Sequence, residues 1–136
     1  MIYLDNSSTT HKKPRKVIKH STKGLKNLSV NPSRGGYSLA IKGSNEIFNC
    51  REKLSNFLGT TPENVIFTSG CTNALNLAII GTVIPKGHII TTIYEHNSVL
   101  RVLEHLKKSH NISYTTLSPN KQGLISTKDI INRIVS

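Results

Sequence analysis

From Val65 onward, short runs rich in β-branched residues alternate with segments whose apolar residues recur at helical spacing. The short runs predict strands at Val65–Thr68, His88–Thr92 and Ile112–Leu117. The other segments predict helices from Thr72 to about Ile84, from Asn97 to about Lys108 and from about Thr127. Strands and helices in repeated succession predict an α/β fold with a mostly parallel sheet flanked by helices on both faces.

The first half of the chain has a different pattern. Ile2–Leu4 predicts a short strand, a polar turn follows it, and Pro14 stands where a proline is tolerated in the first turn of a basic helix. Residues 31–36 contain a proline and two glycines, which interrupt both periodicities and predict a loop. Ser38–Leu58 predicts a long amphipathic helix that Gly59 terminates, with Cys50 on its apolar stripe and therefore in the core.

The turn from Ser69 to Thr72 joins a predicted strand to a predicted helix. The first amides of a helix have no partner within the helix, and the helix dipole is positive at that end, so the turn suits a phosphate or another anion. Gly70 lets the backbone turn sharply and approach a ligand, and Thr72 adds a hydroxyl donor. A second explanation fits the residues equally well, because Ser or Thr caps helices and glycine permits bends without any ligand.

A second polar turn, Tyr94–Asn97, follows the next predicted strand. Ligands of parallel sheets bind at the carboxyl ends of the strands, so both turns are expected to converge on one cleft. His96 lies in this turn, and by its pattern alone it is a polar residue that flanks a helix.

The chain is strongly basic, with a formal net charge of +11. Such a charge is typical of proteins that bind nucleic acids or anionic membranes. Here the densest cluster, from Lys12 to Lys26, overlaps the predicted basic helix, and no aromatic residues are interleaved with it to stack on bases. The sequence therefore favours a solvated helix face over a nucleic-acid site.

Length and composition exclude several other classes. A chain of 136 residues can form at most one domain with a substantial core. No apolar run is long enough to cross a bilayer, and the first residues do not resemble a signal peptide, so we expect a cytoplasmic protein. The two cysteines lack the spacing of a disulfide framework or zinc site, and the six histidines form no metal-binding motif, so no metal is expected.

Residues 3–6, 31–36, 67–72 and 90–100 form four blocks. These blocks resemble the cysteine desulfurases, which are pyridoxal-phosphate (PLP) enzymes of the class V aminotransferase family. The blocks stand in the family's order and spacing, and the resemblance covers nearly the whole chain but only the opening third of a family member.

The resemblance implies the N-terminal part of the large domain of a PLP-dependent transferase of the aspartate aminotransferase type, fold type I. Residues 1–60 would form the N-terminal strand, arm and helices, and residues 61–136 the start of the cofactor-binding domain. It also implies that Gly70, Cys71 and Thr72 hold the PLP phosphate and that His96 stacks on the pyridine ring and assists proton transfer. Asn6 and Arg34 match positions near the substrate.

Some family features are absent from these 136 residues. The lysine that holds PLP covalently lies in a Ser-x-His-Lys block, which the sequence does not contain, and the ring-pairing aspartate and the catalytic cysteine loop are also missing. His11-Lys12 lies in the wrong place, and neither Cys50 nor Cys71 matches the sulfur-accepting cysteine. A sheet of this kind usually continues past a final helix, so we expect a fragment that is inactive as given.

The full-length relative would convert L-cysteine to L-alanine and an enzyme persulfide, which supplies sulfur for iron-sulfur clusters or thio-cofactors. The resemblance also implies a homodimer and a sulfur-acceptor or scaffold protein as partner. Three alternatives remain open at this point. The chain could come from a selenocysteine lyase or another class V enzyme, it could be a basic nucleic-acid-binding module, or it could be a non-functional remnant.

Overall fold

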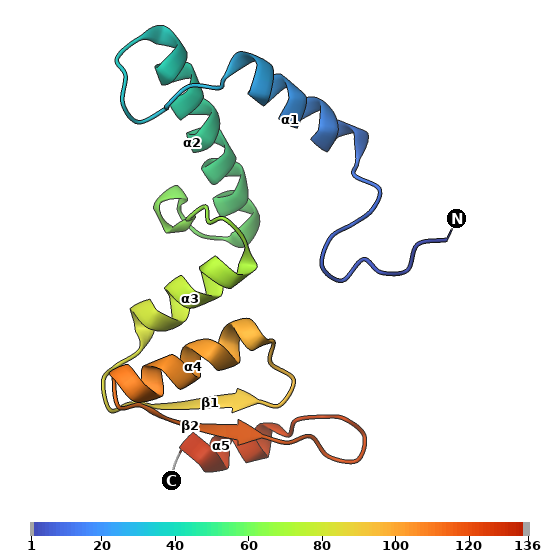
Figure 1. Cartoon of the computed structure of the whole chain (residues 1–136), viewed down its shortest axis with the longest axis vertical. Helices are drawn as coiled ribbons and strands as arrows, with labels where there is room; N and C mark the ends of the chain where they lie inside the picture. The colour runs from blue at the N-terminus through green and yellow to red at the C-terminus, as the bar shows by residue number, and fades with distance from the viewer. Residues whose placement is uncertain (1, 135–136) are drawn as a thin grey trace. The chain divides into compact units, whose positions relative to one another are not determined.

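A computed structural model describes residues 2–134 of the 136-residue chain. The chain divides into two compact units, one ending at Ile66 and the other beginning at Phe67. In chain order (Figure 1) the elements are α1 (Arg15–Asn27), α2 (Ser38–Leu58), the short 3-10 helix η1 (Pro62–Asn64), α3 (Cys71–Thr82), β1 (His88–Thr92), α4 (Asn97–Ser109), β2 (Ser113–Leu117) and α5 (Thr127–Ile134).

The first unit is built around α2. The helix has the predicted bounds, and Gly59 ends it with φ 68°, the left-handed conformation that glycine adopts without a steric penalty. η1 packs against α2 and Ser55 is buried there, with its hydroxyl donating to the Glu52 carbonyl over 2.9 Å. At the other end of α2, the Ser44 hydroxyl donates to the carbonyl of Pro32 and so ties the loop of residues 31–36 to the helix.

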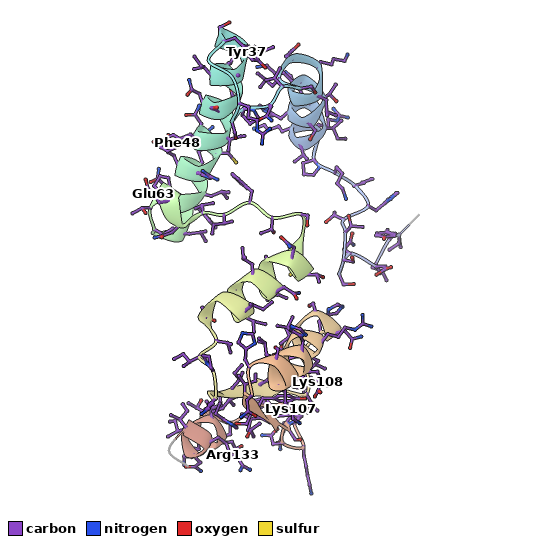
Figure 2. All side chains as sticks on the ribbon, turned by 60° about the vertical axis from the view of Figure 1, so that its left-hand side comes forward. Tyr37, Phe48, Glu63, Lys107, Lys108 and Arg133 are labelled. Atoms are coloured by element: carbon purple, nitrogen blue, oxygen red, sulfur yellow. The ribbon has the colours of Figure 1, made fainter. Side chains whose placement is uncertain are left out.

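The second unit contains one βαβ motif. β1 and β2 are parallel and paired from His88 opposite Ser113 to Thr92 opposite Leu117, and α4 connects them. Lys107 and Lys108 lie in the last turn of α4 (Figure 2), where cations interact favourably with the negative end of the helix dipole. The predicted strand His88–Thr92 is confirmed with these bounds, and the other predicted elements of this motif are confirmed to within one residue.

The two faces of the sheet are covered by different helices. The core of the unit lies between α4 and one face of the sheet, and residues at the end of α3 also pack into it. Its buried members are Val102, Leu103, Leu106 and Ile112, and the partly buried residues packed against them are Ile79, Val83, Ile89, Val99 and Tyr114. On the other face, His88, Ile90 and Thr115 line a cavity together with Arg133 and Ile134 of α5. Figure 1 shows α4 and α5 on opposite sides of the strands. The predicted α/β fold with helices on both faces of a parallel sheet is therefore confirmed.

Two predicted strands are wrong. Ile2–Leu4 and Val65–Thr68 are not strands, and the described residues contain only the two-stranded sheet of β1 and β2. Val65 nevertheless has an extended backbone, with φ −97° and ψ 111°. A strand exists only when a neighbouring strand pairs with its amides and carbonyls, and the residue pattern cannot supply that neighbour.

The prediction that Cys50 lies in the core is also wrong, because Cys50 is exposed on α2. Its neighbours on the apolar stripe are exposed as well: Phe57 shows 86% of its surface and Leu58 shows 65%. The stripe is present, but these residues of it are not covered by the other elements of the first unit. Among the described residues, no helix is both long and apolar enough to cross a membrane.

Candidate functional site

The predicted phosphate turn forms the beginning of α3. Gly70 is the N-cap residue, and its carbonyl accepts the first helical hydrogen bond from the Ala74 amide over 3.0 Å. Its φ of 158° is rarely adopted by residues with side chains, and a Cβ at this position would meet nothing within 4 Å. The turn therefore leaves open space beside Gly70, into which a ligand can approach the backbone closely.

The sequence leaves two explanations open for this turn, and the hydrogen bonds at the beginning of α3 bear on the capping explanation. Among residues 2–134, no side chain accepts a hydrogen bond from the first amides of α3, and the Thr68 hydroxyl donates to the Gly70 carbonyl over 3.1 Å instead of accepting from these amides. The first amides of α3 thus lack a capping side chain, and Cys71 and Thr72 are exposed beside them. Unmet amide donors, the positive end of the dipole and an open approach fit the phosphate of PLP.

His96 is the N-cap of α4. Its Nδ1 accepts a hydrogen bond from the Ser98 amide over 3.1 Å, and the Ser98 hydroxyl lies 3.0 Å from the same nitrogen. The His96 side chain is exposed, whereas Ser98 is buried. His96 therefore flanks a helix as its pattern indicates, and its other ring nitrogen, Nε2, has no hydrogen-bond partner within residues 2–134.

The two turns begin helices on the same side of the second unit. α3 packs against α4, and Figure 1 shows both helices starting at the end toward which β1 and β2 point. This is the end where parallel sheets bind ligands. A cavity of about 430 Å³ between β2 and α5 contains none of the predicted site residues; its lining is Thr116, Leu117, Ser118, Asp129, Asn132 and Arg133.

Asn6 and Arg34 lie in the first unit. The Asn6 side chain organises its own turn, because Nδ2 donates to the Tyr3 carbonyl over 3.2 Å and Oδ1 accepts from the His11 amide over 3.4 Å. Arg34 is exposed on the loop of residues 31–36. The structure describes the two units separately, so the substrate-binding roles of Asn6 and Arg34 stay predictions, as do the roles of the residues in the second unit.

Two residues of this region are not singled out by the sequence pattern. Ser98 holds the His96 ring through its backbone amide. In the sequence, this contact could have been inferred from the position of Ser98 two residues after His96, the residue that caps α4. Tyr94 donates from its hydroxyl to the Gly123 carbonyl over 2.9 Å, which ties the loop after β1 to the turn after β2. The partners are 29 positions apart, so the sequence carries no local signal of this hydrogen bond.

The comparisons with known proteins agree on one family. The family described as Aminotransferase class-V matches residues 2–136. A probable cysteine desulfurase from Borreliella burgdorferi is 32% identical over 136 residues, which covers 96% of this chain and 32% of the relative. A selenocysteine lyase from Xenopus tropicalis is 32% identical over 150 residues and covers 98% of this chain and 34% of the relative.

Solved structures give the same fold. The apo structure of a cysteine desulfurase from Thermococcus onnurineus NA1 has a TM-score of 0.85 and is 24% identical, covering 98% of this chain and 34% of that one. The chain spans about one third of the length of the curated relatives that it matches. Its fold is that of the corresponding part of a fold type I enzyme, and the chain belongs to the class V aminotransferase family.

Proposed function

We propose that this chain carries the phosphate-binding turn and the ring-facing histidine of a PLP-dependent cysteine desulfurase. The class V aminotransferases are PLP-dependent in general. The observation that carries the proposal is the uncapped beginning of α3, which faces the same end of the second unit as His96. Relatives named cysteine desulfurase support L-cysteine as the substrate.

Each proposed residue has a distinct task. The amides after Gly70 and the Thr72 hydroxyl bind the phosphate, Cys71 contributes its backbone, and His96 lies against the ring. Arg34 and Asn6 of the first unit bind the substrate, for which a guanidinium suits the carboxylate of an amino acid. When bound, PLP supplies an electron sink for the bonds that change at the substrate.

The remaining parts of this proposal concern the whole protein. We propose that it is a cytoplasmic homodimer that passes sulfur to an acceptor or scaffold protein. The lysine that holds PLP is not found at a matching block in these 136 residues. The chain by itself should therefore release neither sulfide nor alanine from L-cysteine and PLP, and release of either would contradict this expectation.

The phosphate turn is tested with pyridoxine 5′-phosphate, because this alcohol cannot react with the surface lysines as the aldehyde PLP does. Titration into the ¹⁵N-labelled chain should shift the amide signals of Cys71, Thr72 and Asn73. Pyridoxine without the phosphate is the ligand control and should leave them in place. Thr72→Val, which keeps the side-chain shape but removes the hydroxyl, should weaken binding severalfold. Equal shifts with both ligands, or none, would count against a phosphate site.

A selenocysteine lyase is the second candidate, favoured by the likeness to the Xenopus tropicalis relative. Reading the coding sequence beyond Ser136 shows whether a Ser-x-His-Lys block follows in frame. The protein encoded by such a frame would then be assayed with L-cysteine and with L-selenocysteine. Turnover of both supports a desulfurase, and turnover of L-selenocysteine alone supports the lyase.

A further inference from the structure

The hydrogen bond between His96 and Ser98 determines which ring nitrogen carries the proton. A backbone amide only donates, so Nδ1 of His96 is unprotonated whenever it accepts the 3.1 Å bond from the Ser98 amide. A neutral imidazole has one N–H, which must then be on Nε2. The beginning of α4 therefore selects one of the two tautomers of the ring.

The hydrogen-bond partners of the two ring nitrogens also differ, and the difference favours a proton on Nε2. Nδ1 also lies 3.0 Å from the hydroxyl of Ser98, a residue that is 8% exposed. Nε2 has no hydrogen-bond partner among residues 2–134, and the His96 side chain is exposed. The ring is thus anchored through Nδ1 on the protein side and presents Nε2–H outward.

We propose that Ser98 is a positioning residue that holds His96 in the Nε2–H tautomer. While this bond persists, His96 offers a bound molecule a hydrogen-bond donor and a flat ring face, and it cannot act as a base, because its only basic nitrogen is occupied. A proton can be taken up only at Nδ1, after the bond to Ser98 opens. The inference rests on the proposed function only in taking the molecule that His96 meets to be the cofactor with its substrate.

The experiment measures the tautomer directly in the 136-residue chain labelled with ¹⁵N in its histidine rings. His96 should show one protonated nitrogen, Nε2, and one unprotonated nitrogen, Nδ1. His105 is the internal control, since it lies exposed on the same helix and has no ring hydrogen bond among the described residues. The signals that disappear in His96→Asn identify the His96 ring. A His96 ring that averages both tautomers as His105 does would overturn the proposal.

Two variants separate the amide of Ser98 from its hydroxyl. Ser98→Pro removes the N–H at a first-turn position where proline is tolerated, and it should move the His96 signals to the averaged pattern of His105. Ser98→Ala keeps the amide and should keep the single tautomer. If both variants lost the single tautomer to the same extent, the proposed role of the Ser98 amide would be overturned. The wild-type spectrum stands by itself if a variant fails to fold, and failure to bind a PLP analogue would refute the proposed function without changing the tautomer.

Discussion

At the scale of single residues, His96 has one observed role and one proposed role. Its ring caps α4 through Nδ1, and the family resemblance places the same ring against the cofactor. The two roles use different atoms, so they can be separated by substitution. Asparagine has an acceptor oxygen that suits an N-cap but has no aromatic ring.

We therefore expect His96→Ala to lower the free energy of unfolding by about 1 kcal/mol, the typical cost of losing an N-cap acceptor. His96→Asn should stay close to the wild-type value, because its side chain can still accept from the Ser98 amide. Urea unfolding followed by circular dichroism measures both, with His105→Ala as the control on the same helix. Equal destabilisation by Ala and Asn would show that the acceptor atom does not stabilise α4.

A second residue-scale prediction concerns Tyr114, whose hydroxyl donates to the Glu104 carboxylate. This hydrogen bond raises the pKa of Tyr114, and the neighbouring negative charge and slight desolvation act in the same direction. Because the folded pKa is raised, the stabilising contribution is fully present below the ordinary tyrosine pKa and is lost as the pH rises through the folded value.

Glu104→Gln should accordingly lower the pKa of Tyr114 toward its ordinary value, because the carboxylate charge is lost. Titration of the phenolate absorbance at alkaline pH measures the change, and Tyr114→Phe identifies which transition belongs to this residue. Glu46→Gln on α2 is the matched control and should leave the transition in place. A Tyr114 titration that is the same in Glu104→Gln and wild type would refute the assignment of the shift to Glu104.

At the scale of elements, α2 shows how local chemistry defines a helix. Its apolar period runs to Leu58, and Gly59 in the left-handed conformation ends it where the sequence predicts. In α1, by contrast, no steric constraint calls for a glycine at position 24. Gly24 lies inside the helix, and a Cβ there would meet nothing within 4 Å. The same amino acid is thus required at one position and unnecessary at the other.

This difference predicts opposite effects of the same substitution. Gly59→Ala should destabilise the first unit by about 1 kcal/mol, since alanine is strained at positive φ. Gly24→Ala should increase helix content and stabilise α1 by about 0.5–1 kcal/mol, the difference in helix propensity. Far-ultraviolet circular dichroism and urea unfolding of the two variants test the pair. Destabilisation by Gly24→Ala would mean that the described environment of α1 is wrong.

At the scale of the whole molecule, many large apolar side chains remain exposed in each of the two units. Phe57, Ile66 and Ile84 each expose at least 66% of their surface, and Phe48 projects from the middle of α2 (Figure 2). Monomeric proteins rarely expose large contiguous apolar patches, and β1 and β2 form a sheet of only two strands within the described residues. Each unit thus exposes apolar side chains that can associate with those of another copy.

We therefore expect the 136-residue chain to self-associate. Sedimentation velocity over a range of concentrations should show a rising mean mass, and the double variant Phe57→Ser, Leu58→Ser should reduce it by removing two exposed apolar side chains of α2. Leu124→Ser is the control for a general gain in solubility, because Leu124 is 65% exposed in the other unit. A chain that sediments as a monomer throughout the range would contradict the expectation.

The elements of the βαβ motif, the bounds of α2 and the α/β class could be predicted from the amino-acid sequence, because they depend on residue periodicity and local turn chemistry. The sequence also located the turn at Gly70 and the histidine at position 96. Two features could be seen only in the folded chain: the Thr68 hydroxyl donates to the Gly70 carbonyl and does not cap α3, and the Ser98 amide holds the His96 ring. The structure also shows that Val65–Thr68 is not a strand and that Cys50 is exposed. The physical reason is the same in each case: pairing, burial and the direction of a hydrogen bond depend on which neighbour is present in space.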